Sequence, residues 1–153
     1  MNENEDAKQK IIDYLASPSH MKMTLATVTP DGKPLAHTVV YVSEGATVYF
    51  RSMDHRRKYS NILNNPRVAY TVDEYPGDDW RQLQGVQMEG VATVLTNQAE
   101  IDRVTELYLK KFPCAERFVP KTRPGLKVIK IEPVEGDFLD YREAIGHREK
   151  VTF

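Results

Sequence analysis

Residues 22–51 read KMTLATVTPDGKPLAHTVVYVSEGATVYFR, and this stretch decides the fold class. It alternates runs of β-branched and aromatic residues, which favour strands, with short proline- or glycine-containing segments, which favour tight turns. Three strands separated by such short turns predict an antiparallel meander. The predicted strands are Lys22–Thr29, Pro34–Val42 and Ala46–Arg51.

The rest of the chain predicts helices and further strands around this meander. Apolar residues recur at helical spacing in three segments, and proline or a capping box marks an end of each. Helices are expected over Ala7–Leu15, over His55–Leu63 and, after the capping box Asn97-x-x-Glu100, up to Phe112. Further strands are expected over Arg67–Val72, Leu83–Leu95, Lys127–Glu132 and Asp137–Tyr141, with a break from Pro133 to Gly136.

Long antiparallel strands with few helices need their sheet edges closed, which favours a barrel over an open sheet. The predicted fold class is therefore α+β, a β-barrel of mostly antiparallel strands with a few flanking helices. Gly90 interrupts an alternating apolar face and predicts a bulge or a point of close packing. The chain is expected to divide into an N-terminal helix packed on the barrel (1–20), a barrel domain (21–145) and a C-terminal tail (146–153).

Composition limits the possible functions. The chain has 153 residues, of which 41% are hydrophobic and 28% charged, and these values predict one folded domain. A net charge of −1 gives no overall field toward nucleic acid or an acidic membrane, so neither is expected as a partner. The acidic N-terminus and the single cysteine, Cys114, predict a cytoplasmic protein without a disulfide.

The densest group of basic residues is Arg51 followed by His55-Arg56-Arg57-Lys58, at a strand end and in the first turn of a predicted helix. Unpaired N–H groups and the helix dipole favour an anion at a helix N-terminus, and Arg and Lys would add charge-assisted hydrogen bonds. A helix stabilised only by its own dipole would carry acids there. The cluster therefore predicts either a phosphate site or a solvated basic surface, and the residues alone favour the two equally.

Three motifs follow one another in a fixed order, and together they resemble a known family. They are Leu25-Ala26-Thr27-Val28-x-x-Asp31-Gly32-x-Pro34, then Val48-Tyr49-Phe50-Arg51-Ser52, then Arg57-Lys58-x-x-Asn61-Ile62-x-Asn64-Asn65-Pro66-Arg67-Val68. Their succession resembles the FMN-binding split barrel of the pyridoxamine 5′-phosphate oxidase-like superfamily. The resemblance extends from about Met21 to Tyr141.

The resemblance implies a homodimer that holds FMN in the groove between its subunits. It implies that Arg57 and Lys58 grip the FMN phosphate, and that Arg51 and Ser52 line the ribityl and phosphate path. Gln84 is similar to a glutamine that reaches the flavin from the other subunit. The strand residues that would pass along the isoalloxazine ring and give it backbone hydrogen bonds are His37, Thr38, Val39, Val40 and Tyr41.

The chain departs from the family pattern in two places. Arg56 stands where a serine commonly precedes the Arg-Lys pair, which makes the cluster more cationic and removes one hydroxyl. The chain closes with Val151-Thr152-Phe153, without the Trp and Arg-Leu elements that hold the pyridoxal ring in true pyridoxamine phosphate oxidases. We therefore expect an activity other than pyridoxamine phosphate oxidation.

Two classes of function follow from the resemblance. The first is an FMN-dependent oxidoreductase of unknown substrate and reductant, in which FMN supplies the redox chemistry and no catalytic side chain is assigned. The second is a non-catalytic module that binds flavin, deazaflavin or haem. A third possibility is another phosphorylated ligand in the basic groove.

Four other features have simpler interpretations. The carboxylates from Asp73 to Asp79 lack histidine and metal-site spacing, so a solvated loop and no metal are expected. Trp80 is either a substrate-stacking residue or a rim residue of the barrel. His147 is expected in a solvated tail, and Cys114 is expected to be incidental or buried.

Overall fold

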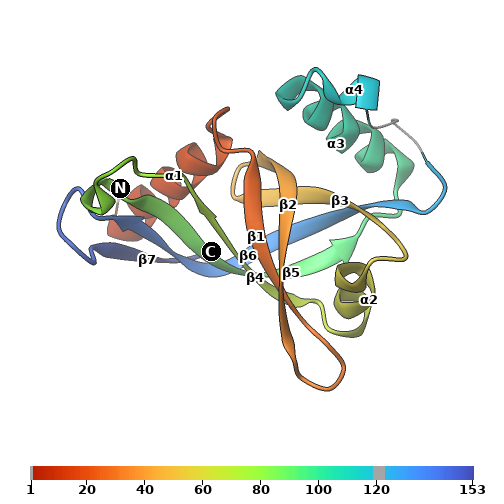
Figure 1. Cartoon of the computed structure of the whole chain (residues 1–153), viewed down its shortest axis with the longest axis horizontal. Coiled ribbons are helices and arrows are strands. Elements are labelled where there is room, and N and C mark those ends of the chain that lie inside the picture. Colours follow the sequence, from red (N-terminus) through yellow and green to blue (C-terminus); the bar gives the residue numbers. More distant parts are fainter. Residues whose placement is uncertain (1, 119–122) are drawn as a thin grey trace.

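The computed structural model of the protein describes residues 2–118 and 123–153. In this part of the chain, strands and helices follow one another as Figure 1 shows. The helical elements are α1 (Glu3–Ala16), α2 (Arg57–Asn64), the short η1 (Trp80–Gln82), α3 (Gln98–Lys111) and α4 (Ala115–Phe118). The strands are β1 (Lys22–Val28), β2 (Pro34–Glu44), β3 (Thr47–Met53), β4 (Arg67–Asp73), β5 (Gln84–Val94), β6 (Leu126–Asp140) and β7 (Arg148–Thr152).

The strands form a closed antiparallel barrel, which confirms the predicted α+β split-barrel class. They pair in the order β3-β2-β1-β4-β5-β6-β7, and a further pairing of β3 with β6 closes the ring. Strand β7 extends the sheet beyond the barrel along β6. This closure pairs the edges of β3 and β6, which would otherwise be open to another chain.

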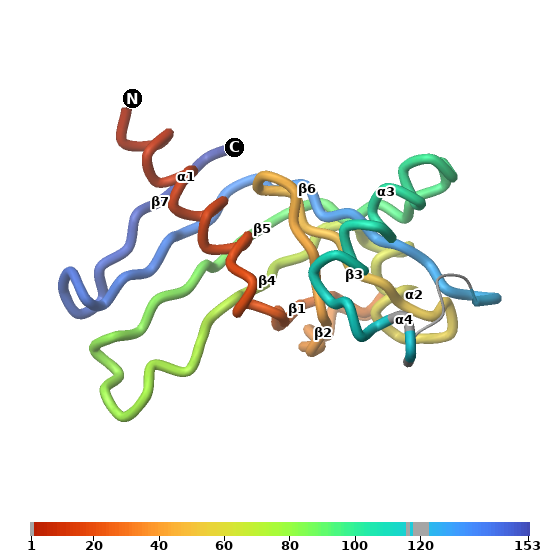
Figure 2. The backbone as a smooth tube through the Cα atoms, turned by 90° about the horizontal axis from the view of Figure 1, so that it is seen from above, coloured from red at the N-terminus to blue at the C-terminus, as the bar shows by residue number. Residues whose placement is uncertain are grey.

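The barrel interior and the inner face of α1 share one hydrophobic core. Residues of α1 recur at helical spacing on the buried face, where Ile11 and Leu15 are fully buried. They pack with large barrel side chains such as Tyr41 and Phe50. Helix α3 covers a second, smaller cluster on the outside of β3, so α1 and α3 lie over different parts of the barrel (Figure 2).

The predicted break between two final strands is wrong, because β6 runs without interruption from Leu126 to Asp140. A register shift lies between Glu89 and Gly90, so that Val134 is an extra residue opposite β5, next to Pro133. Such a bulge accommodates a proline that has no N–H to donate. The expectation of a bulge or close packing at Gly90 is confirmed, because a Cβ there would lie 2.6 Å from Ile131 Cγ2.

Residues 146–153, expected as a tail, contain strand β7, which pairs with Glu135–Leu139 of β6. The side chain of Asn4 in α1 accepts a hydrogen bond from the Thr152 N–H (2.9 Å) and donates one to the Thr152 carbonyl (3.1 Å). Val151 is fully buried, but it is the single core residue of a charged segment. The sequence pattern was too weak to show this strand, since pairing with β6 and α1 supplies its stabilisation.

The two ends of the described chain lie near each other, as Figure 2 shows for α1 and β7. Among the described residues, none of the helices is both long enough and apolar enough to cross a membrane.

Candidate cofactor site

Helix α2 begins without a side-chain cap. Its N-cap residue is Arg56, which makes no capping hydrogen bond, and its first turn contains no acid. By contrast, α1 and α3 are capped by the side chains of Asn2 and Asn97, each of which accepts a backbone N–H. The first N–H groups of α2 and the positive end of its dipole are therefore available to an anion.

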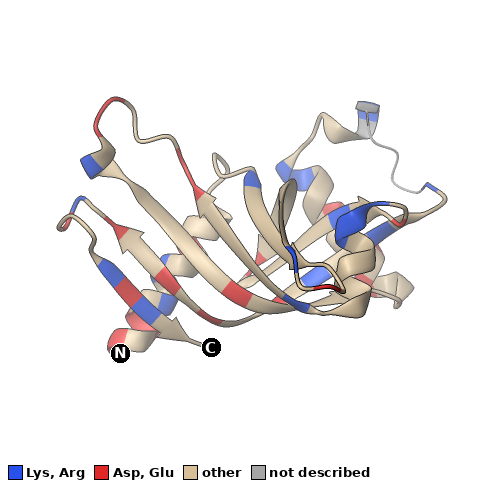
Figure 3. Ribbon diagram, turned by 60° about the horizontal axis from the view of Figure 1, so that its bottom comes forward, with Lys and Arg blue, Asp and Glu red and all other residues tan. Residues whose placement is uncertain are grey.

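The basic residues at this helix start are not neutralised by carboxylates. In the described part of the chain, Arg56, Arg57 and Lys58 form no ion pair, whereas exposed arginines elsewhere do, as Arg81 does with Asp79 at 2.8 Å. Burial lowers the pKa of Lys58, and the charge of Arg56 lowers it further. Figure 3 shows basic residues gathered at α2 and mixed charges along β6 and β7. The local excess of positive charge favours an anionic ligand.

Strand β2 has an open edge next to this cluster. It pairs with β1 through Pro34–Val40, but it pairs with β3 only through Tyr41–Glu44. Among the described residues, no strand pairs with the other edge of 34–40. Backbone N–H and C=O groups along this edge can therefore serve a planar ligand with hydrogen-bonding groups at its rim.

The residues predicted to lie along the flavin ring, His37 to Tyr41, divide between the two faces of β2, which we call the platform strand. Thr38 and Val40 are exposed on the outer face, whereas Val39 is buried and His37 is half-buried on the inner face. Tyr41 lies beyond the open edge: its side chain is fully buried, its N–H donates to the Met21 carbonyl, and its carbonyl accepts from Lys111 Nζ. The structure thus brings His37 to Val40, and not Tyr41, to the open edge.

His37 joins β2 to α2 through β1. Its Nε2 lies 2.8 Å from Thr27 Oγ1, and Asn61 Nδ2 of α2 donates a 3.0 Å hydrogen bond to the same oxygen. Burial lowers the pKa of His37, and the charges of Lys58 and Arg57 lower it further. Three of the predicted site residues, His37, Arg57 and Lys58, therefore act on one another electrostatically.

Arg51 and Ser52 make other contacts. The Arg51 guanidinium lies 5.2 Å from the ring centroid of Tyr108 in α3, and burial lowers the pKa of Arg51. Ser52 is buried on the opposite side of β3, and its hydroxyl donates to the Met53 carbonyl. Within one chain, the structure directs Arg51 toward α3 and Ser52 inward.

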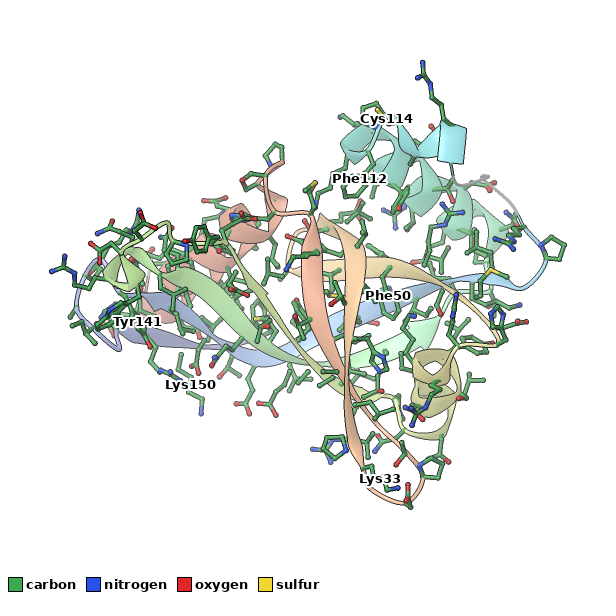
Figure 4. The ribbon with its side chains drawn as sticks, in the orientation of Figure 1. Lys33, Phe50, Phe112, Cys114, Tyr141 and Lys150 are labelled. Carbon is green, nitrogen blue, oxygen red and sulfur yellow. The ribbon has the colours of Figure 1, made fainter. Side chains whose placement is uncertain are left out.

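Gln84 lies at the end of the molecule that is opposite α2. Its side chain donates to Asp140 Oδ2 at 3.2 Å, and Asp140 is also bound by Arg142. The neighbouring Tyr141 N–H donates to the Leu83 carbonyl, and Figure 4 shows Tyr141 at the end of the molecule opposite α2. Within a single chain, Gln84 therefore cannot join Arg57 and Lys58.

A groove of 620 Å³ lies on the outer face of the sheet between these two ends. Strands β1, β4, β5, β6 and β7 line it, with small residues such as Thr24 and Ala26 at one side. Thr24 pairs in register with the exposed Thr38 of β2. The groove is thus continuous with the outer face of the platform strand.

Three residues whose interpretation the sequence left open are Trp80, His147 and Cys114. Trp80 is 57% exposed and meets Tyr141 edge to face at a centroid distance of 6.4 Å, at the Gln84 end of the molecule. His147 lies in the turn before β7, 3.4 Å from Glu149, and Cys114 is exposed.

Sequence reasoning assigned no role to Thr27 and Asn61. Both occur in the motifs that carry the resemblance, and both are buried polar residues, at 1% and 5% exposure. Asn61 lies one helical turn after Arg57, and this spacing could have indicated that it shares a face with the cluster.

The chain is a closed, split antiparallel barrel with a basic helix start beside an open strand edge. Residues 10–140 match the pyridoxamine 5′-phosphate oxidase family, and the chain belongs to it.

Proteins similar to the chain include a curated relative and the following solved structures. The 5a,11a-dehydrotetracycline/5a,11a-dehydrooxytetracycline reductase of Streptomyces rimosus is 34% identical over 91 residues, which are 57% of this chain and 63% of the relative. A proposed pyridoxamine 5′-phosphate oxidase of Listeria innocua superposes with a TM-score of 0.67 at 24% identity, covering 86% of this chain and 97% of that one. A haem-binding protein of Mycobacterium smegmatis gives a TM-score of 0.77 at 19% identity, covering 99% and 58%.

The chain thus spans less than two thirds of the length of the curated relative. At these identities the two solved structures show a shared fold.

Proposed function

We propose that the protein is an FMN-dependent oxidoreductase that works as a homodimer. The observation that carries the proposal is the group of uncompensated cations, Arg56, Arg57 and Lys58, at the uncapped start of α2 beside the open edge of β2. Membership of the pyridoxamine 5′-phosphate oxidase family and similarity to a reductase support it.

The donor groups of this site fit FMN. Arg57 can offer a bidentate fork and Lys58 a point charge to a phosphate, and the N–H groups of α2 add further donors. Backbone groups of His37 to Val40 fit the polar rim of an isoalloxazine ring. Arg51 and Ser52 would be secondary contacts along the ribityl path, with Arg51 leaving Tyr108 to reach it.

The position of Gln84 supports the homodimer. Since Gln84 lies far from α2 within one chain, the flavin contact that the resemblance implies would come from the partner subunit. The outer groove offers the second copy a continuous surface that runs from β7 to the platform strand. The FMN would lie at the edge of this surface, in the groove between the subunits.

Bound FMN would supply hydride transfer, so the protein need contribute only binding, orientation and shielding. Arg57 and Lys58 would hold the phosphate, and β2 would fix the ring plane. A partner subunit over the outer groove would exclude water from the ring face. The substrate would be a small organic molecule, and the reductase activity of the relative supports a reductive reaction.

The visible absorption spectrum of the purified protein, before and after addition of FMN and removal of the excess, tests the cofactor. Flavin bands that remain at about one FMN per chain would support the proposal, and bleaching by a nicotinamide reductant with turnover would support the enzyme. A flavin complex without turnover would favour a binding module. Retention of haem or deazaflavin in place of FMN would contradict the cofactor assignment.

The double variant Arg57→Ala/Lys58→Ala tests the site. Loss of two charge-assisted contacts, each worth about 1.5–3 kcal/mol, should weaken FMN binding by at least about 100-fold. The variant Lys8→Ala/Lys110→Ala removes the same charge from α1 and α3 and should bind FMN like the wild type. Equal affinity of a folded Arg57→Ala/Lys58→Ala variant would place the phosphate elsewhere.

A further inference from the structure

A chain of two hydrogen bonds links three elements beneath the basic cluster. Asn61 of α2 donates to Thr27 Oγ1 of β1 at 3.0 Å, and Thr27 Oγ1 lies 2.8 Å from His37 Nε2 of β2. Thr27 is 1% exposed and Asn61 is 5% exposed, so water cannot take over either bond. The groups must satisfy one another.

The hydrogens of this chain can be assigned by counting donors. The Asn61 amide already donates to Thr27 Oγ1, so the single Thr27 hydroxyl hydrogen needs an acceptor of its own. Among the described residues, His37 Nε2 is the group at hydrogen-bonding distance that can accept it. A buried O–H without an acceptor is destabilising, so the Thr27 hydroxyl donates to His37 Nε2. Neutral His37 then carries its own hydrogen on Nδ1.

The surroundings favour the neutral form of His37. Burial of the imidazole is the largest effect, and the charged groups that act on it are Lys58 and Arg57, both on α2. All three effects lower the pKa of His37. A positive imidazolium would donate from Nε2, so the buried Thr27 hydroxyl hydrogen would lose its acceptor.

The same bonds orient the start of α2. Asn61 follows Arg57 by four residues, so both lie on one face of the helix, one turn apart. Because Asn61 is tied to β1, the face that carries Arg57 is held at a fixed angle to β2.

We propose that Thr27 and Asn61 are positioning residues of the anion site: they hold neutral His37 with its hydrogen on Nδ1 beside Arg57 and Lys58, and they fix α2 against β2. The benefit for FMN rests on the proposed function. The tautomer of His37 does not, because it belongs to the protein without ligand.

The first experiment reads the tautomer in the ligand-free protein by ¹⁵N NMR of the histidine side chains at pH 8. A nitrogen without hydrogen resonates well downfield of one that carries hydrogen. We expect His37 Nε2 to resonate downfield, as a nitrogen without hydrogen, in the wild type and in Thr27→Ser, which keeps the hydroxyl. In Thr27→Val, the Nε2–H form that predominates in free histidine should appear, and the pKa of His37 should rise because the neutral form has lost a donor.

The second experiment measures FMN affinity in the same variants. Loss of one positioning hydrogen bond should weaken FMN by about tenfold in Thr27→Val, and Thr27→Ser should recover most of it. Asn61→Ala should weaken FMN similarly, whereas Asn64→Ala, at the exposed end of the same helix, should not. Thermal unfolding of each variant checks that it is folded.

Each result has a distinct meaning. A wild-type His37 that carries its hydrogen on Nε2 would overturn the proposal, and this measurement needs no variant. An unchanged tautomer in folded Thr27→Val would overturn it as well. If the wild type binds no FMN, the proposed function fails, while the tautomer in the ligand-free protein still decides whether Thr27 positions His37.

Discussion

The ammonium of Lys111 lies 3.9 Å from the ring centroid of Tyr41, and its Nζ donates a 3.1 Å hydrogen bond to the carbonyl of the same residue. Lys111 is near the end of α3, and Tyr41 is where β2 leaves β1 and joins β3. This pair therefore ties the outer helix to the point at which the platform strand changes partners.

Lys111 predicts a pH dependence of stability. Burial lowers its pKa from 10.5 to about 8, because the charged ammonium loses hydration in the folded state. Below pH 8 the lysine is protonated in both states, and the penalty for the buried charge is fully present. Between pH 8 and 10.5 the unfolded chain binds more protons, so the free energy of unfolding rises with pH.

Urea unfolding of wild type and Lys111→Met across this pH range measures the effect. The wild type should gain stability relative to the variant as the pH rises from 8 to 10.5. Lys110→Met, at the exposed neighbouring position, should follow the wild type. A constant difference between wild type and Lys111→Met would show that Lys111 titrates normally.

Mixed dimers test whether Gln84 acts across the subunit interface. One copy carries Arg57→Ala/Lys58→Ala and the other Gln84→Ala, each defective in FMN binding as a pure dimer. If the site combines α2 of one copy with Gln84 of the other, a mixed dimer has one intact site and one site with both defects. We expect each mixed dimer to bind FMN with wild-type affinity at its intact site, which is about half the number of sites in a wild-type dimer. No recovery in verified mixed dimers would place Gln84 outside the site or in the same chain.

Gly90 predicts a packing cost. A Cβ at this position would lie 2.6 Å from Ile131 Cγ2 and 2.7 Å from the Glu132 carbonyl oxygen, and backbone cannot easily move away. Gly90→Ala should therefore reduce the free energy of unfolding by about 1–3 kcal/mol. Thr93→Ala, at an exposed position of the same strand, should change it by less than about 0.5 kcal/mol in denaturant titrations. Equal stability of the two variants would mean that β6 shifts freely at the bulge.

Arg51 predicts separable effects on stability and binding. Its guanidinium packs over Tyr108, so Arg51→Ala should lose about 0.5–2 kcal/mol of stability. FMN affinity should fall far less than in Arg57→Ala/Lys58→Ala, because Arg51 is a secondary contact. Calorimetric titration with FMN, beside urea unfolding, measures both. A loss of affinity as large as in the double variant would make Arg51 a primary phosphate anchor.

The sequence predicted the parts of the fold that depend on neighbouring residues. The strands of residues 22–51, the buried face of α1 and the N-cap at Asn97 follow from alternation, helical spacing and capping chemistry. The basic start of α2 was also visible, because its residues are adjacent in the chain. Strand β7 and the continuous β6 were not predicted, since one buried valine and a bulged proline give little local signal.

The sequence by itself determined most strands and helices of the barrel and the position of the basic cluster, because these depend on interactions between residues close in the chain. Only the tertiary structure decided that β3 closes on β6, that β2 keeps an open edge, and that Gln84 lies far from α2. It alone joined Thr27, His37 and Asn61. These relationships depend on strand register and on the docking of α2, which arise from packing between segments distant in sequence.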